Sequence, residues 1–233
     1  MTHFLVITGA SRGIGEQTAA TFLRDGWQVL NLSRTDSKMS GITSINIDLT
    51  KPDAIHNAAK TLQEKVDGAG KICLIHNAAL LKNNQVDTLD ENDLREDLEI
   101  NVIAPVILNK IFLPFMKPGS SIIYIGSTLS EIGVANRASY VIAKHAIAGL
   151  MRATCQDLAG KEISTCCICP GFTDTKMLHD AVPDDTLKQI IKENVTFGRL
   201  ANPQEIADLI YFAATHPVIN GAMLHANLGQ VDS

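Results

Sequence analysis

The apolar residues of this chain gather in short runs, and longer stretches with a helical period separate most of these runs. Short apolar runs bounded by turn residues are typical of buried strands. We expect strands over residues 4–7, 29–32, 45–48, 72–76, 122–125, 165–169 and 222–225.

The stretches between the runs space their apolar residues as helices packed against a core do. Proline stands near the start of two of them, at Pro52 and Pro203, where the missing backbone N–H would lack an intrahelical partner anyway. We expect helices over residues 14–24, 52–65, 91–115, 139–158, 184–194 and 203–214.

An alternation of strand and helix predicts a parallel sheet with helices on both faces. The 233 residues, of which 45% are hydrophobic, suffice for one sizeable core. We therefore expect an α/β fold, with one Rossmann-type domain over residues 1–233 and a doubly wound parallel sheet of about seven strands.

The least regular stretch, residues 173–200, is the natural substrate region because it follows the sixth expected strand. We expect residues 176–199 to form a mobile lid that closes over the substrate. The alternative is a fixed surface helix packed on the core. The apolar positions that suit one face of a short amphipathic helix are Leu178, Val182, Leu187, Ile190 and Ile191.

A glycine-rich turn, Thr8-Gly9-Ala10-Ser11-Arg12-Gly13-Ile14-Gly15, joins the first expected strand to its helix. Glycine permits positive φ and close approach of the backbone to a pyrophosphate at a helix N-terminus. The spacing differs from the G-x-G-x-x-G pattern of dinucleotide sites, and turn glycines also occur simply where the chain changes direction. The turn nevertheless indicates a nucleotide.

The end of the second expected strand predicts which nucleotide. There, about 20 residues beyond the last glycine, an acid would hold a ribose 2′-hydroxyl and an arginine would hold a 2′-phosphate. Ser33 stands in the acid's place, Arg34 follows it, and Arg12 could supply a second cation. These residues favour NADP (NADPH) over NAD, although Asp36 is a competing signal for NAD if the strand ends later.

Tyr140 and Lys144 lie four positions apart in a largely buried helical stretch and therefore share one face. A cation within about 4–6 Å lowers the pKa of a tyrosine from about 10 toward the range of a useful general acid. Ser127 follows the fifth expected strand, at the edge of the sheet where ligands bind. The three indicate proton transfer to a bound substrate, although a Tyr-x-x-x-Lys pair also arises by chance on helix surfaces.

In their order along the chain, the glycine turn, Asn77-Ala78-Ala79, Asn101, Ser127, the Tyr140/Lys144 pair and Pro170-Gly171 resemble the single-domain branch of the short-chain dehydrogenase/reductase family. The resemblance covers essentially the whole chain, and 3-oxoacyl-carrier-protein reductase-like and carbonyl-reductase-like members look similar throughout. Two positions depart from the family's Asn-Asn-Ala-Gly motif. His76 replaces its first asparagine and Ala79 replaces its glycine.

The resemblance implies an oxidoreductase that moves a hydride between a nicotinamide and a carbonyl or secondary alcohol. It makes Tyr140 the general acid/base, with Lys144 lowering its pKa and binding the nicotinamide ribose. Ser127 would orient the carbonyl oxygen, and Asn101 would hold a relay water beside Lys144. The cofactor-binding residues implied by the motifs and the resemblance are Gly9, Ser11, Arg12, Gly13, Ile14, Gly15, Ser33, Arg34, Asp48, Leu49, Asn77, Ala78, Tyr140, Lys144, Pro170, Gly171, Thr173 and Thr175.

Charge and composition exclude several partners. A net charge of −5 without a lysine or arginine cluster argues against nucleic acid, and no uninterrupted apolar run reaches membrane-spanning length. The five cysteines show no paired framework, so we expect reduced thiols and a cytoplasmic protein. Strand alternation turns Cys166 away from Cys167 and Cys169, which argues against a metal site. His76 is expected to be a hydrogen-bonded structural residue.

Two other functions stay open. One is an NAD-linked alcohol dehydrogenase working in the oxidative direction, which Asp36 would favour. The other is a nucleotide-binding regulatory protein without catalysis, against which the presence of all four polar residues, Asn101, Ser127, Tyr140 and Lys144, argues. The resemblance also implies a homodimer or homotetramer built on helix faces, and the partner is a small carbonyl or alcohol substrate.

Overall fold

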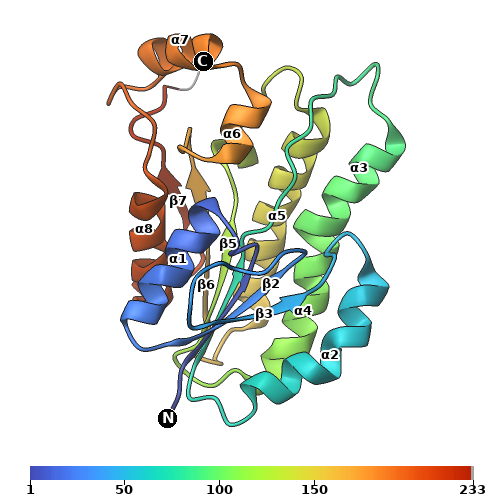
Figure 1. Ribbon diagram of the computed structural model, residues 1–233, viewed down its shortest axis with the longest axis vertical. Coiled ribbons are helices and arrows are strands. Elements are labelled where there is room, and N and C mark those ends of the chain that lie inside the picture. The colour runs from blue at the N-terminus through green and yellow to red at the C-terminus, as the bar shows by residue number, and fades with distance from the viewer. Residues whose placement is uncertain (232–233) are drawn as a thin grey trace.

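The computed structural model describes residues 1–231, so the last two residues of the expected domain lie outside the described residues. Seven strands form one parallel sheet in the order β3-β2-β1-β4-β5-β6-β7 (Figure 1). This arrangement confirms the predicted doubly wound α/β fold. The strands are β1 (Phe4–Thr8), β2 (Gln28–Ser33), β3 (Ile42–Asn46), β4 (Ile72–His76), β5 (Ser121–Ile125), β6 (Ser164–Pro170) and β7 (Met223–Ala226).

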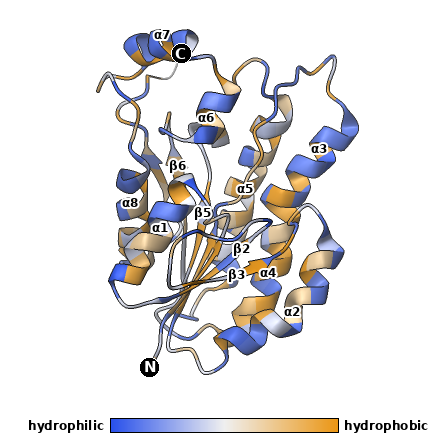
Figure 2. Ribbon diagram, in the orientation of Figure 1, coloured by the Kyte–Doolittle hydropathy of each residue, from blue (hydrophilic) through white to orange (hydrophobic). Residues whose placement is uncertain are grey.

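Helices cover both faces of the sheet and enclose two apolar cores. Helices α1 and α8 pack on one face, and α2, α4 and α5 pack on the other. Figure 2 shows hydrophobic residues concentrated in the strands and in α4. The helices are α1 (Gly13–Arg24), α2 (Pro52–Val66), α3 (Glu91–Leu98), α4 (Ala104–Phe112), α5 (Ala138–Asp157), α6 (Lys176–Ala181), α7 (Asp184–Asn194) and α8 (Pro203–Thr215).

The predicted position of the third strand is wrong by a few residues. The strand runs over Ile42–Asn46 and not over residues 45–48, so Asp48 lies in the loop that follows. β3 is an edge strand whose residues are half-buried or exposed, and such a strand lacks the continuous apolar run that marks a central parallel strand. The expected range of 45–48 therefore starts inside β3 and runs two residues past its end.

The long helix predicted over residues 91–115 is interrupted in its middle. α3 begins after Asp90, whose side chain accepts a hydrogen bond from Asn92 N, and a π-helical turn over Glu99–Ile103 separates α3 from α4. π turns occur frequently at functional sites. By length and composition alone Glu91–Phe115 could cross a membrane, but α4 within it packs into the core against the sheet.

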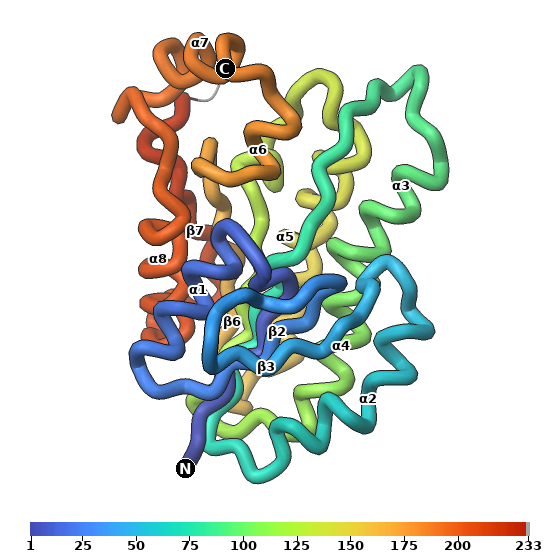
Figure 3. The backbone as a smooth tube through the Cα atoms, in the orientation of Figure 1, coloured from blue at the N-terminus to red at the C-terminus, as the bar shows by residue number. Residues whose placement is uncertain are grey.

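The segment after β6 contains two helices, α6 and α7, where one short amphipathic helix had been expected within 176–199. Val182 and Pro183 separate them, because proline lacks the backbone N–H that would continue α6. Figure 3 shows this segment at the end of the molecule opposite the N-terminus, over the carboxyl ends of the strands. The chain then returns to the sheet through α8.

Candidate active site

The carboxyl ends of β1 and β4 meet at the point where the strand order of the sheet reverses. Asn77, just beyond β4, joins them: its side-chain Nδ2 donates to the carbonyl oxygens of Thr8 (2.9 Å) and Gly9 (3.1 Å). The Thr8 hydroxyl in turn accepts the backbone N–H groups of Asn77 and Ala78, each at 2.9 Å. Asn77 therefore fixes the glycine turn to the central sheet.

The glycine turn needs its glycines for geometric reasons. Gly9 and Gly13 have φ values of +74° and +61°, which disfavour any side chain. A Cβ at Gly15 would lie 2.3 Å from the Gly9 carbonyl oxygen and 2.6 Å from Asn77 Nδ2. The first turn of α1 receives no hydrogen bond from the side chain of Arg12, the residue that precedes it. Its N–H groups are therefore suited to an anion such as a pyrophosphate.

One large cavity runs from this turn to the segment that carries α6 and α7. Its volume of about 1360 Å³ exceeds the roughly 300–1,000 Å³ of an ordinary small-molecule pocket, so it has room for a dinucleotide and a second molecule. The predicted residues that line it are Gly9, Ser11, Arg12, Gly13, Ile14, Gly15, Ser33, Arg34, Asp48, Leu49, Asn77, Ala78, Ser127, Tyr140, Lys144, Pro170, Gly171, Thr173 and Thr175.

Asn101 is the one predicted site residue that does not line this cavity, although its neighbour Ile100 does. It lies in the π turn, 1% exposed, and its Nδ2 donates to the backbone carbonyl oxygen of Asp97 at 3.0 Å. Its Oδ1 is buried and has no hydrogen-bond partner. A buried acceptor of this kind is suited to an ordered water.

Tyr140 and Lys144 lie on the same face of α5, next to the end of β5. Lys144 is 2% exposed, and its Nζ donates to the Ile125 carbonyl oxygen at 2.8 Å and lies 5.4 Å from the centroid of the Tyr140 ring. Burial lowers the pKa of Lys144 to about 8. Ser127 lines the cavity beside Tyr140 and accepts a hydrogen bond from Leu129 N at 3.2 Å.

The pKa of Tyr140 is raised in this structure, and not lowered as its spacing to Lys144 predicted. The pKa of Tyr140 is raised to about 12, chiefly by burial and to a smaller extent by Asp97 and Cys169 when these are ionised. The Ser127 hydroxyl and the Arg137 cation oppose this increase without cancelling it. The phenol is consequently protonated at neutral pH, as a proton donor must be.

Polar groups surround the other end of the cavity, at β2. The Ser33 hydroxyl accepts from Asn31 Nδ2 (2.9 Å) and donates to the Thr35 carbonyl oxygen (2.6 Å). Arg12, Arg34 and Lys38 line this end as cations, and Asp36 lines it as an anion. Lys38 was not predicted from the sequence. It lies in the loop after β2, where the pattern of apolar and polar residues does not show which side chains turn toward the cavity.

Asp48 also lies at this end, and its carboxylate is held in place. Its Oδ1 accepts hydrogen bonds from the Thr50 backbone N–H (3.1 Å) and hydroxyl (2.8 Å). Burial acts to raise the pKa of Asp48, but these hydrogen bonds and the charges of Arg34 and Lys51 outweigh it and lower the pKa. Asp48 therefore presents a negative, fixed oxygen group near the cations.

Two further residues that line the cavity, Asn84 and Arg137, were not predicted from the sequence. Asn84 Nδ2 donates to the Ser139 hydroxyl at 2.8 Å, and Asn84 Oδ1 accepts from Ser139 N at 3.0 Å, which fixes the start of α5 just before Tyr140. Arg137 donates to the carbonyl oxygens of Ala181 (3.0 Å) and Lys82 (3.4 Å). Neither residue belongs to a sequence motif, so only the fold brings them to the cavity.

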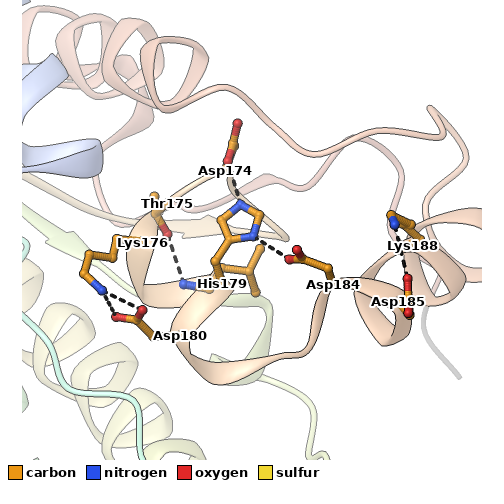
Figure 4. A network of polar contacts seen from close by, with 9 residues as sticks. Asp174, Thr175, Lys176, His179, Asp180, Asp184, Asp185 and Lys188 are labelled. Atoms are coloured by element: carbon orange, nitrogen blue, oxygen red, sulfur yellow. Dashed lines mark hydrogen bonds and ion pairs between the residues drawn. The ribbon is translucent and has the colours of Figure 1, made fainter.

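The segment between β6 and α7 is held by a histidine between two carboxylates, as Figure 4 shows. His179 Nε2 lies 2.9 Å from Asp174 Oδ1, and its Nδ1 lies 3.3 Å from Asp184 Oδ1. The hydrogen bonds to Asp174 and Asp184 raise the pKa of His179. Only the doubly protonated ring can donate to both carboxylates, so this contact ties β6, α6 and α7 together best when His179 is charged.

His76 is a structural residue, as the sequence suggested. It is 3% exposed, and its Nε2 donates to Asn109 Oδ1 at 2.8 Å. Asn109 Nδ2 donates to the Tyr124 hydroxyl at 2.7 Å, which contacts the Thr154 hydroxyl at 2.8 Å. Burial lowers the pKa of His76 to about 4, so the ring is neutral near pH 7.

The three cysteines of β6 lie on its two faces, as predicted. Cys166 packs in the core under α1 and α8, whereas Cys167 and Cys169 pack in the opposite core, with their sulfur atoms 3.9 Å apart. All five cysteines are free thiols. Within residues 1–231, no group of three or more histidine, cysteine, aspartate or glutamate side chains is arranged to hold a metal ion.

The chain is similar to known proteins along nearly all of its length. The family model described as enoyl-(acyl carrier protein) reductase matches residues 9–230. The chain is 30% identical over 225 residues to dehydrogenase/reductase SDR family member 6 of Xenopus laevis, with 91% of this chain and 89% of that protein covered. It is 28% identical over 239 residues to the 3-oxoacyl-acyl-carrier-protein reductase FabG of Vibrio cholerae, with 96% and 95% covered.

A solved structure shares the fold. The crystal structure of a short-chain dehydrogenase family protein from Francisella tularensis superposes with a TM-score of 0.87 at 28% identity, with 98% of each chain covered. The similarity therefore includes the sheet, the helices on both faces and the segment above the strand ends.

Proposed function

Because this chain belongs to the short-chain dehydrogenase/reductase family, we propose that it is an NADPH-dependent reductase of a small carbonyl compound, with Tyr140 as its general acid/base. The strongest support is that Ser127, Tyr140 and Lys144 line the same cavity as the glycine turn. NADPH bound along the cavity would supply the hydride. The same site would oxidise the corresponding alcohol in reverse.

Each polar residue has a distinct task in this proposal. The Ser127 hydroxyl orients the carbonyl oxygen of the substrate, as oxyanion-hole donors do for a few kcal/mol. Tyr140 donates its proton to that oxygen, a step that contributes roughly 10²–10⁴-fold in comparable enzymes. The Lys144 ammonium binds the nicotinamide ribose, and Asn101 Oδ1 holds the water that returns a proton toward Tyr140.

The preference for NADPH rests on the cations at the β2 end of the cavity. Arg12, Arg34 and Lys38 line this end, and guanidinium groups suit a 2′-phosphate. A second candidate, an NAD-linked dehydrogenase, is supported by Asp36, which lines the same end and would accept the ribose hydroxyls of NAD. The three cations against one carboxylate favour NADPH.

We further propose that residues 176–199 are a lid and that the protein is a homodimer or homotetramer. The lid proposal rests on Met177, Leu178 and Val182, which line the cavity from α6 and the residue after it. The oligomer proposal rests on apolar side chains that remain well exposed in the π turn and on α4 and α5, where Ile103, Val106 and Ile142 are 39%, 37% and 44% exposed.

The test is the absorbance of NADPH and of NADH during incubation with a panel of ketones and aldehydes. We expect faster oxidation of NADPH, and we expect Tyr140→Phe to lose at least about 100-fold in kcat with little change in NADPH affinity. Tyr211→Phe is the matched control, because Tyr211 contacts Asp25 and does not line the cavity. Near-normal kcat in Tyr140→Phe would refute the assigned acid.

Two other outcomes separate the alternatives. Preference of the unmodified protein for NADH would refute the NADPH assignment and support the NAD-linked dehydrogenase. Binding of either nucleotide without turnover of any compound in the panel, in either direction, would support a regulatory nucleotide-binding protein instead.

A further inference from the structure

Asp97 is a carboxyl group that the mechanism above does not use, and it is wholly buried. It lies in the last turn of α3 and is 0% exposed. Neither carboxylate oxygen has a partner in good hydrogen-bond geometry, although the Ser139 hydroxyl lies close to the carboxyl group. An unpaired buried carboxylate is costly, whereas the neutral acid is tolerated far better. Burial raises the pKa of Asp97, and the Ser139 hydroxyl and Lys82 only partly oppose this increase.

A second orphaned acceptor lies one turn further along the chain. Asn101 Oδ1 is buried without a partner, while the Nδ2 of the same side chain donates to the Asp97 backbone carbonyl oxygen. Glu99 Oε2, between them in the chain, is also buried without a partner. These acceptors come from the last turn of α3 and the π turn that follows it, and acceptors alone cannot satisfy one another. A carboxylic acid proton and a water would supply the missing donors.

Polar and charged groups face Asp97 from the loop after β4, from α3 and from α5. Lys82, on the loop after β4, pairs with Asp93 (2.8 Å) and Glu96 (2.5 Å) of α3 at the protein surface. On α5, Ser139, Tyr140 and Lys144 face it, and Asp97 would raise the pKa of both Tyr140 and Lys144 whenever it is ionised. Asp97 therefore lies between two groups of residues. One is the partly exposed ion pairs of Lys82 with α3, and the other is the buried Tyr140 and Lys144 of α5.

We propose that Asp97 is a positioning residue that supplies protons to Tyr140 through Asn101. This inference rests on the proposed reductase function. In reduction, the Tyr140 proton goes to the carbonyl oxygen as hydride reaches the carbonyl carbon. The phenolate takes a proton from the water at Asn101 Oδ1, that water takes one from the Asp97 acid, and the Asp97 carboxylate regains a proton from solvent beside Lys82. The proton count therefore balances over each turnover.

The test is the Asp97→Asn variant, which keeps the size of the side chain and removes its transferable proton. We expect kcat to fall at least about tenfold, with unchanged KM for NADPH and a larger solvent deuterium isotope effect on kcat, because reprotonation of Tyr140 becomes limiting. The isotope effect from deuterated NADPH should shrink for the same reason. Glu91→Gln is the matched control, since Glu91 is on the same helix but is 83% exposed and pairs with Arg95.

An infrared measurement tests the proton itself without requiring turnover. We expect the carbonyl stretch of a protonated carboxyl group near neutral pH in the unmodified protein, and its loss in Asp97→Asn but not in Glu91→Gln. Absence of that band would overturn the proposal, and so would normal kcat in Asp97→Asn. A lower kcat with unchanged isotope effects and a lower unfolding temperature would also overturn it, because that result describes a structural residue.

Failure of this proposal differs from failure of the proposed function. If the unmodified protein turns over no carbonyl compound, the reductase function is refuted, and the proton path with it. If the unmodified protein is active and Asp97→Asn is equally active, only the proton path is refuted.

Discussion

Lys144 allows a direct measurement of what the site costs in stability. Its side chain is 2% exposed, and burial lowers its pKa from the ordinary 10.5 to about 8. At about 1.36 kcal/mol per pKa unit, holding the charge inside the protein costs the folded state about 3 kcal/mol near pH 7. Methionine has a similar length and no charge, so Lys144→Met should unfold less readily than the natural protein at pH 7.

The sign of the pH dependence follows from proton binding. Between pH 8 and 10.5 the unfolded chain keeps the Lys144 proton while the folded protein has lost it, so the folded state gains stability as pH rises through this window. We expect the natural protein to gain about 3 kcal/mol relative to Lys144→Met across it. The lost hydrogen bond to the Ile125 carbonyl oxygen, worth about 1.5–3 kcal/mol when charged, offsets part of the gain of Lys144→Met at pH 7.

The assay is urea unfolding of both proteins at a series of pH values between 7 and 10.5. Lys60→Met is the control, because the Lys60 side chain is 89% exposed and its substitution should leave the pH dependence unchanged. Parallel curves for the natural protein and Lys144→Met would refute the reasoning, since they would mean that the ammonium is not desolvated. Loss of activity in Lys144→Met is expected in either case.

Three further predictions concern other parts of the molecule. Arg34→Asp should lower the ratio of kcat/KM for NADPH to that for NADH at least about tenfold, because like charges then meet at the 2′-phosphate; an unchanged ratio would assign recognition to Arg12 or Lys38. The neutral, buried His76 should cost the protein up to about 3 kcal/mol of stability as pH falls from 6.5 to about 4, and urea unfolding of His76→Asn should lack this loss. Since its carboxylate partners raise the pKa of His179, its contact should stabilise residues 174–184 below that pKa and weaken as pH rises through it. Hydrogen exchange corrected for intrinsic rates measures this, and equal protection in His179→Ala at every pH would contradict it.

The sequence by itself determined the features that depend on neighbours along the chain. Continuous apolar runs identified the central strands, because a buried parallel strand must be apolar on both faces. The glycine turn and the four-residue spacing of Tyr140 and Lys144 were equally readable, because turns and helix faces are local geometry. The edge strand β3 was misplaced for the complementary reason, since its exposed residues leave a weaker pattern.

Only the tertiary structure decided how the site residues behave. The predicted direction of the Tyr140 pKa was wrong because segments distant in the chain bury the phenol, and burial raises its pKa. The π turn at Asn101, the fixing of α5 by Asn84 and the unpaired acid at Asp97 each depend on contacts between α3, α5 and the loop after β4. Charge and proton affinity depend on all atoms within several ångströms, and the fold alone places those atoms.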